Sequence, residues 1–195
     1  MVVSIRYNVI CGRQSNEQES VYNQIAVGIS EQRVSGSRAA IAQLRPVYPE
    51  DTEFRAAFTD KTLRTTSSRN KQVARFVLFQ IEQQASASSF DFESARYDME
   101  HVLPEHPGED WQQFDDQQRD ACTYRLGNLT LLTAGHNRDA GNAGYAAKRS
   151  IYQDSEFAIT RKLAEDYDTW TSDKIRSRQA WMARQATAIW RIDSW

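Results

Sequence analysis

The residue types that could carry chemistry gather in two short segments. The first, residues 97–104, reads YDMEHVLP and places Glu100 directly before His101. The second, residues 125–137, reads RLGNLTLLTAGHN, in which a Gly-Asn pair leads into a short apolar run and a His-Asn pair closes it. Hydrolysis of a phosphodiester needs an activated water, an electrophilic centre and stabilisation of the leaving oxygen. A neutral histidine and one bound cation can supply these functions, so the two segments predict a hydrolytic site.

Each of these side chains has an expected role. His101 is the expected general base, because an unperturbed imidazole has a pKa of about 6.5 and is largely neutral at cytosolic pH. Asn128 is expected to fix either the backbone or the imidazole of His101. Glu100 and Asn137 offer oxygen ligands to a divalent metal, Mg²⁺ by preference with Mn²⁺ as a substitute, and His136 competes with Asn137 for that role. Neighbouring strand residues point to opposite faces, so the chain must bend after His101 for both members of the Glu-His pair to serve one site.

The order of these residues is similar to that of HNH nucleases, a compact ββα fold that grips one divalent metal. The match becomes more specific in EHVLP at 100–104, RLGNLTLL at 125–132, and then Asn137 and Lys148. These motifs resemble the HNH domain of GmrSD-type modification-dependent restriction enzymes, including relatives that sense phosphorothioated DNA. The flanks match as well, and the likeness spans roughly residues 50–192: the flanking residues are Asp98, Trp111, Trp170, Ile175, Arg178, Ala186 and Trp190.

The resemblance implies a function. It implies a metal-dependent DNA endonuclease, nicking or cutting both strands, that acts as the nuclease module of an anti-phage restriction system. In that family the domain usually follows a ParB-like nucleotide-hydrolysing sensor of modified DNA. No P-loop and no ParB-like motif is found in this sequence, so a sensor domain or subunit is expected outside this chain. Asp139 stands where the family often has lysine, which makes it an extra ligand or a sign of a rewired site. The alternative is a non-catalytic HNH-like module that binds DNA or docks a partner.

Charge is distributed unevenly along the chain. The formal net charge is −2, and residues 96–150 carry six basic and nine acidic side chains, so the expected site is acidic and suits a cation. Residues 60–75 instead carry five basic side chains against one acid, and phosphate contacts by such groups dominate non-specific DNA affinity. The predicted DNA-binding residues are Lys61, Arg64, Arg69, Lys71, Arg138 and Lys148.

Composition limits the compartment and the size of the core. Cys11 and Cys122 lie far apart without CxxC spacing, which favours a reducing bacterial cytoplasm over a disulfide framework. No apolar run approaches the roughly 18 residues of a membrane span. Apolar residues make up 40% of the chain, enough for a real core.

Periodicity predicts a mainly α protein with one small embedded β-hairpin, in which a ββα-metal core lies inside a helical domain. A helical region is expected over 1–95, the nuclease core over 96–153, and helices that pack on it over 154–195. Residues 1–12 are consistent with either a strand or the end of a helix. A stripe of Val21, Ile25 and Ile29 predicts a helix over 16–33, and Ser67 or Ser68 is expected to cap another that runs to about residue 84.

Overall fold

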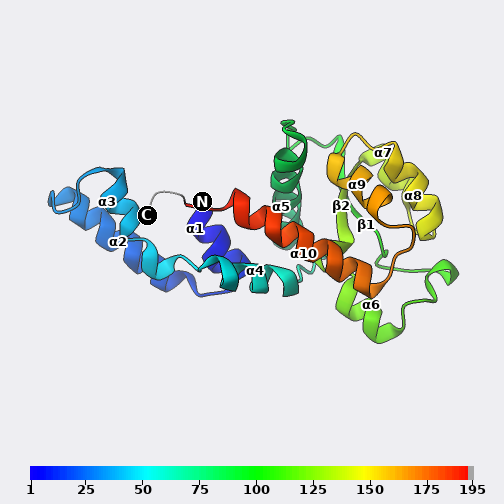
Figure 1. The fold of residues 1–195 in the computed structure, drawn as a ribbon, viewed down its shortest axis with the longest axis horizontal. Helices are drawn as coiled ribbons and strands as arrows, with labels where there is room; N and C mark the ends of the chain where they lie inside the picture. Colours follow the sequence, from blue (N-terminus) through cyan, green and yellow to red (C-terminus); the bar gives the residue numbers. More distant parts are fainter. Residues whose placement is uncertain (193–195) are drawn as a thin grey trace. The chain divides into compact units, whose positions relative to one another are not determined.

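The computed structural model describes residues 1–192 and is mainly helical with one two-stranded antiparallel sheet, as the sequence predicted (Figure 1). The chain forms two compact units. One comprises Met1–Thr59 together with the segment from Ala186 onward, and the other comprises Asp60–Gln185. The expected boundaries at residues 95 and 153 both fall inside the second unit. No helix among the described residues has the length and apolar content needed to cross a membrane.

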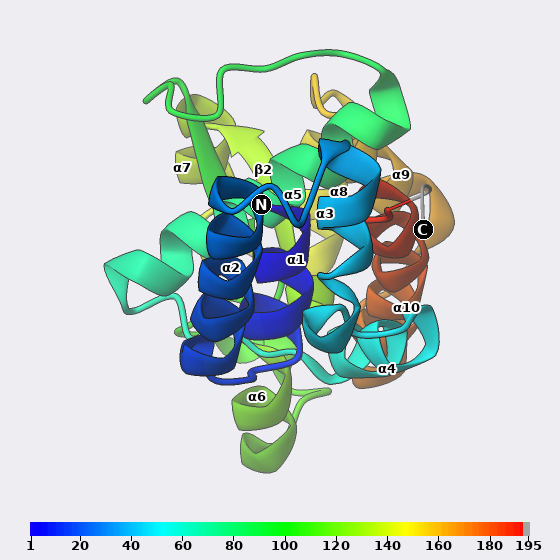
Figure 2. The same cartoon turned by 90° about the vertical axis from the view of Figure 1, so that its left-hand side faces the viewer.

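The first unit is built from short helices: α1 (Val2–Ser4), a π-helical turn (Ile5–Ile10), α2 (Ser15–Ser30), α3 (Gly36–Ala42) and α4 (Asp51–Asp60). The opening residues are therefore helical, which settles the alternative that the sequence left open. Val3, Tyr7, Val47 and Tyr48 form a small core beneath α2. The helices of this unit, α1 to α4, are labelled in Figure 2. Its most buried cation is Arg6, which lies between the rings of Tyr48 and Phe54.

The second unit contains the sheet. Strands β1 (Tyr97–His101) and β2 (Leu129–Thr133) pair antiparallel, with Tyr97 opposite Thr133 and His101 opposite Leu129. Helix α7 (Ala134–Ala140) follows β2 directly, and the Thr133 hydroxyl accepts a hydrogen bond from the His136 N–H at its first turn. The order is thus strand, strand, helix.

The two strands are not joined by a tight turn. Residues 102–128 connect them and contain α6 (Asp116–Cys122) and two 3₁₀ turns, Glu109–Trp111 and Leu126–Asn128. The connection is well packed, because Val102, Leu103 and Trp111 are fully buried in the main core of this unit.

Four further helices pack around the sheet: α5 (Ser68–Ser86), α8 (Tyr145–Gln153), α9 (Ala158–Asp166) and α10 (Ser172–Ile189). Buried polar side chains hydrogen-bond these helices to one another and to the sheet. Glu82 of α5 accepts hydrogen bonds from the N–H groups of Ala158 and Ile159, where a carboxylate complements the helix dipole of α9. Arg178 of α10 donates to the carbonyls of Gly127 and Leu129, at the entry to β2.

Helix α5 is also tied to the start of β1. The guanidinium of Arg75 donates to three carbonyl oxygens, those of Phe92 at 2.7 Å, Ser94 at 2.8 Å and Tyr97 at 2.6 Å. A planar guanidinium has five N–H donors in a fixed geometry, so one side chain orders the whole segment that leads into the strand.

Candidate active site

His101 ends β1, and its ring is largely buried. The side chain is 15% exposed, and Nε2 lies 3.0 Å from the hydroxyl oxygen of Thr65 and 3.8 Å from Oε1 of Glu105. The ring of Tyr124 meets the imidazole edge to face, with centroids 6.0 Å apart. Burial lowers the pKa of His101, and Lys148 and Lys71 lower it further, whereas Glu105 and Asp98 oppose them. The net effect favours the neutral ring, the form that can accept a proton.

Glu100 precedes His101 in β1 and is buried. It is 5% exposed, and its Oε1 accepts hydrogen bonds from Lys148 Nζ at 2.6 Å and from the Tyr152 hydroxyl at 2.8 Å. Lys148 Nζ also donates to the backbone carbonyl of His101 at 2.9 Å. Burial raises the pKa of Glu100 and lowers that of Lys148, and the ion pair opposes both shifts. Lys148 therefore both neutralises Glu100 and holds the end of β1.

Asn128 fixes the backbone next to His101. Its Oδ1 accepts from the Leu103 N–H at 2.8 Å and from Trp170 Nε1 at 3.0 Å. Its Nδ2 donates to the carbonyls of Leu103 at 2.9 Å and Thr123 at 3.0 Å. These four bonds use the whole capacity of a primary amide, so the Asn128 side chain is committed to the backbone. Asn128 was expected to fix either the backbone or the imidazole of His101, and its hydrogen bonds are those of a residue that fixes the backbone.

Asn137, on α7, faces β1. Its Nδ2 donates to Oδ2 of Asp98 at 3.1 Å, while its Oδ1 is buried and has no hydrogen-bond partner within residues 1–192. His136 precedes it, and the buried Nδ1 of His136 also lacks a partner within that range.

A hollow of about 210 Å³, here called the His101 hollow, brings three of the predicted residues together. Glu100, His101 and Asn137 all line it, whereas His136 and Asp139 do not. Asp139 is exposed on α7. The lining residues are Met99, Glu100, His101, Pro104, Glu105, His106, Asn137, Gly141 and Asn142.

Whether this site could hold a metal ion can be judged from the side-chain oxygen of Asn137. Among the described residues, no three His, Cys, Asp or Glu side chains are grouped to hold a metal ion. Any site must then use few protein ligands together with water, which is the coordination that Mg²⁺ tolerates best. A buried acceptor without a partner is costly, and Oδ1 of Asn137 is such an acceptor beside the Asp98 carboxylate. A hard cation would satisfy it, so these oxygen donors fit the group.

The predicted DNA-binding residues divide into exposed and buried ones. Arg64, Arg69, Lys71 and Arg138 are exposed, and Lys61 is partly so. Arg64 lies over the Tyr124 ring at 5.2 Å, and Lys71 Nζ lies 3.6 Å from Asp98. The prediction for Lys148 is wrong, because its side chain is completely buried against Glu100 and offers no surface to DNA.

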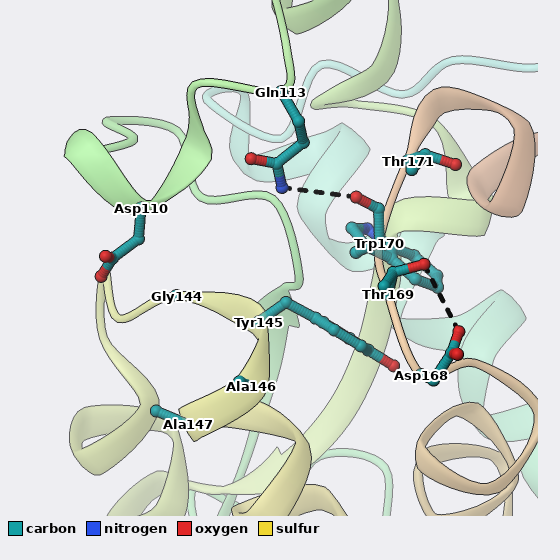
Figure 3. Close-up of a pocket in the computed structure, with 10 residues that line it drawn as sticks. All are labelled: Asp110, Gln113, Gly144, Tyr145, Ala146, Ala147, Asp168, Thr169, Trp170 and Thr171. Carbon is teal, nitrogen blue, oxygen red and sulfur yellow. Dashed lines mark hydrogen bonds between the residues drawn. The ribbon is translucent and has the colours of Figure 1, made fainter.

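Figure 3 shows a second and larger hollow, of about 640 Å³, next to the N-terminus of α8. The Tyr145 ring stacks on Trp170 with centroids 5.5 Å apart, and Asp110 and Asp168 line the hollow. None of the predicted catalytic, metal or DNA-binding residues lines it. No imidazole lines this hollow, whereas His101 lines the smaller one, so a histidine general base could act only in the smaller hollow.

Several residues at the site were not predicted. Thr65, Glu105 and Tyr124 surround the imidazole, and Tyr152 binds Glu100. Glu105 follows His101 by four residues, which is a local signal within the sequence itself. The segments of Thr65 and Tyr124 are paired where the Leu63 N–H donates to the Tyr124 carbonyl at 2.8 Å. The sequence contains no motif or spacing that predicts this pairing.

Comparison with known proteins adds one finding. A protein-family model described as "GmrSD restriction endonucleases, C-terminal domain" matches residues 48–185, which include every residue of the His101 hollow. A search of curated proteins finds no match.

Proposed function

The chain belongs to the family of GmrSD restriction endonuclease C-terminal domains, and on that premise we propose that it is a metal-dependent DNA endonuclease of the HNH type. The observation that carries the proposal is the His101 hollow. There a buried imidazole with a lowered pKa shares one cavity with Glu100 and Asn137. The strand, strand, helix order of β1, β2 and α7 supports an HNH core.

In the proposed mechanism, His101 accepts the proton of a water that attacks the phosphorus atom of DNA. Asn128 keeps the strand end in place through both backbone groups of Leu103, and Lys148 holds the carbonyl of His101 itself. The general base is therefore aimed by buried contacts on both sides of its own backbone.

A divalent cation, Mg²⁺ or Mn²⁺, is the proposed cofactor. Its ligands would be the Asn137 amide oxygen and carboxylate oxygen from Glu100, with His136 as the alternative to Asn137. The structure adds Asp98 as a further oxygen donor, since it lies beside Asn137. When bound, the cation supplies Lewis-acid polarisation of the phosphate and stabilises charge on the leaving oxygen.

The exposed basic residues are the proposed DNA contacts. Arg64, Arg69 and Lys71 lie on or just before the first turn of α5, and Arg138 lies on α7, which carries Asn137. Phosphate contacts of this kind position the duplex without reading its sequence. Recognition of a modified base would then come from the proposed ParB-like nucleotide-hydrolysing partner. The widely separated cysteines Cys11 and Cys122, which lack CxxC spacing, suit the bacterial cytoplasm, where we propose that the activity lies.

One observation favours the alternative of a non-catalytic module that binds DNA or docks a partner. Glu100 already has a cationic partner, because Lys148 lies 2.6 Å from its carboxylate. A divalent ion at Glu100 has to share that carboxylate with an ammonium group. Whether the isolated protein binds a divalent metal distinguishes the two functions: binding favours the endonuclease, and no binding favours the non-catalytic module.

The decisive experiment is cleavage of supercoiled plasmid with Mg²⁺ or Mn²⁺, with and without chelator. We expect chelator to abolish nicking and His101→Ala to reduce the rate about 10²- to 10⁴-fold, the usual contribution of a general base. His106→Ala is the comparison variant, since it removes the other imidazole that lines the His101 hollow, and it should lower the rate much less than His101→Ala.

Full activity in His101→Ala would reject the base assignment. Inactivity with every metal, with and without an added ParB-like sensor, combined with retained binding to DNA, would establish the docking module instead.

A further inference from the structure

Thr65 lies in the segment between α4 and α5, and the fold holds this segment firmly. Thr62 pairs with Arg125 in an isolated β-bridge, and the Leu63 N–H donates to the Tyr124 carbonyl at 2.8 Å. Asn70 donates to the carbonyl of Arg64 at 3.1 Å. Thr65 itself is 8% exposed. Its hydroxyl therefore has a fixed position relative to β1.

This hydroxyl lies between His101 and Glu105. Oγ1 is 3.0 Å from Nε2 of His101, and it donates to Oε1 of Glu105 at 3.5 Å. Tyr124 also hydrogen-bonds to Glu105, and its ring meets the His101 ring edge to face. The arrangement is a short chain of ring nitrogen, hydroxyl and carboxylate.

The direction of the hydrogen bonds in that chain follows from counting protons. A hydroxyl has one proton to donate, and an ionised carboxylate can only accept. Thr65 donates its one proton to Oε1 of Glu105, and this leaves an Oγ1 lone pair for Nε2. Nε2 must then carry a proton in the neutral ring. The ring nitrogen that holds the proton is set by the hydrogen bond that it makes, so the other nitrogen, Nδ1, keeps its lone pair.

We propose that Thr65, backed by Glu105, is the positioning residue that fixes His101 as the Nε2–H tautomer, so that Nδ1 is the atom that accepts the proton from water. The inference rests on the proposed function of His101 as the general base and deepens it by naming the reactive atom. It also assigns a role to a residue 36 positions before the histidine, on a segment that otherwise carries only predicted DNA contacts.

The first test is spectroscopic and needs neither metal nor DNA. The protein has three histidines, so ¹⁵N labelling of their rings gives three sets of signals, and His101→Gln identifies the set of His101. We expect a dominant Nε2–H tautomer in the wild type. Thr65→Val keeps the shape but removes the hydroxyl, and it should shift the His101 ring nitrogens toward a mixture of tautomers.

Matched variants separate this effect from a change in packing. Thr65→Ser restores a hydroxyl and should restore the wild-type ring signals, whereas Thr66→Val makes the same substitution at the exposed neighbour and should change nothing. Glu105→Gln, at a position with a 36% exposed side chain, should weaken the preference without threatening the fold. This last variant keeps the proposal testable even if Thr65→Val does not fold.

The second test is kinetic. Thr65→Val should lower kcat for plasmid nicking about ten- to a hundredfold, part of what a general base contributes, with KM for DNA unchanged and with rescue by serine. Ring signals that stay the same in folded Thr65→Val and in Glu105→Gln would overturn the proposal. A changed tautomer together with full nicking by His101→Ala would instead leave the positioning role standing and reject His101 as the base.

Discussion

Asn128 holds the backbone that follows His101. It is completely buried, and all four of its amide bonds are to groups that must stay in place: the N–H and carbonyl of Leu103, the carbonyl of Thr123 and the indole of Trp170. The amide is needed because two of these groups are acceptors and two are donors, and only Asn or Gln offers both from one planar group.

Asn128→Asp should therefore destabilise the protein despite its nearly identical shape. The change replaces two N–H donors with an oxygen that faces two carbonyl oxygens in a buried site, at a cost of about 2–4 kcal/mol. Denaturant unfolding of the metal-free protein measures it. Asn142→Asp, at an exposed position, is the control and should cost less than about 0.5 kcal/mol. Equal stability of the two variants would mean that the amide donors are dispensable.

At the scale of elements, the 3₁₀ turn Leu126–Asn128 must approach α10 closely. A Cβ atom built on Gly127 would lie 2.2 Å from the carbonyl oxygen of Ile175 and 2.9 Å from Cβ of Gln179. Gln179 also accepts from the Gly127 N–H at 3.1 Å. Glycine at position 127 allows the backbone of this turn to lie directly against α10. Because β2 follows the turn, the contact also fixes the start of β2 relative to α10.

Gly127→Ala should push the turn away from α10 and cost at least about 1–3 kcal/mol, because the clashing atom belongs to the backbone. Gly135→Ala is the matched control within α7. Its nearest atom is 3.9 Å away, and alanine favours a helix, so this variant should be neutral or up to about 1 kcal/mol more stable. Thermal unfolding of both variants decides the matter, and a tolerated Gly127→Ala would show that the approach is relaxed.

At the scale of the whole molecule, a net charge of −2 offers no general attraction for DNA, so binding must rest on a local group of cations. Arg64, Arg69 and Lys71 are exposed together before and within the first turn of α5. Substituting all three by Gln should weaken DNA binding and flatten the dependence of log K on log salt by about 0.9 for each phosphate that the protein no longer neutralises.

Fluorescence anisotropy with duplex DNA across a salt series measures that slope. The control removes the same number of exposed cations elsewhere, by Gln substitution of Arg38, Arg55 and Arg184. If both triple variants lose affinity equally, then the three residues near α5 have no special place in binding.

Features that depend on neighbouring residues in the sequence could be predicted. Contacts between residues far apart in the sequence, and the burial that they cause, could not. Helix periods and the β1 and β2 segments were found because each is a contiguous pattern, and His101 and Asn137 were brought together as expected. The stripe that predicted α2 does not say how far burial extends along the helix, since Ile25 is 8% exposed and Ile29 is 53% exposed. Lys148 was assigned to DNA because charge in a sequence carries no sign of burial.

The three hydrogen bonds from Arg75 to the segment before β1 have a mechanical consequence. They tie the helix that carries the proposed DNA contacts to the strand that carries the proposed general base. A backbone phosphate held at the start of α5 would then lie a set number of nucleotides from the bond that is broken. On the proposed function, the distance between the bound phosphate and the cleaved bond would then not depend on the base sequence between them.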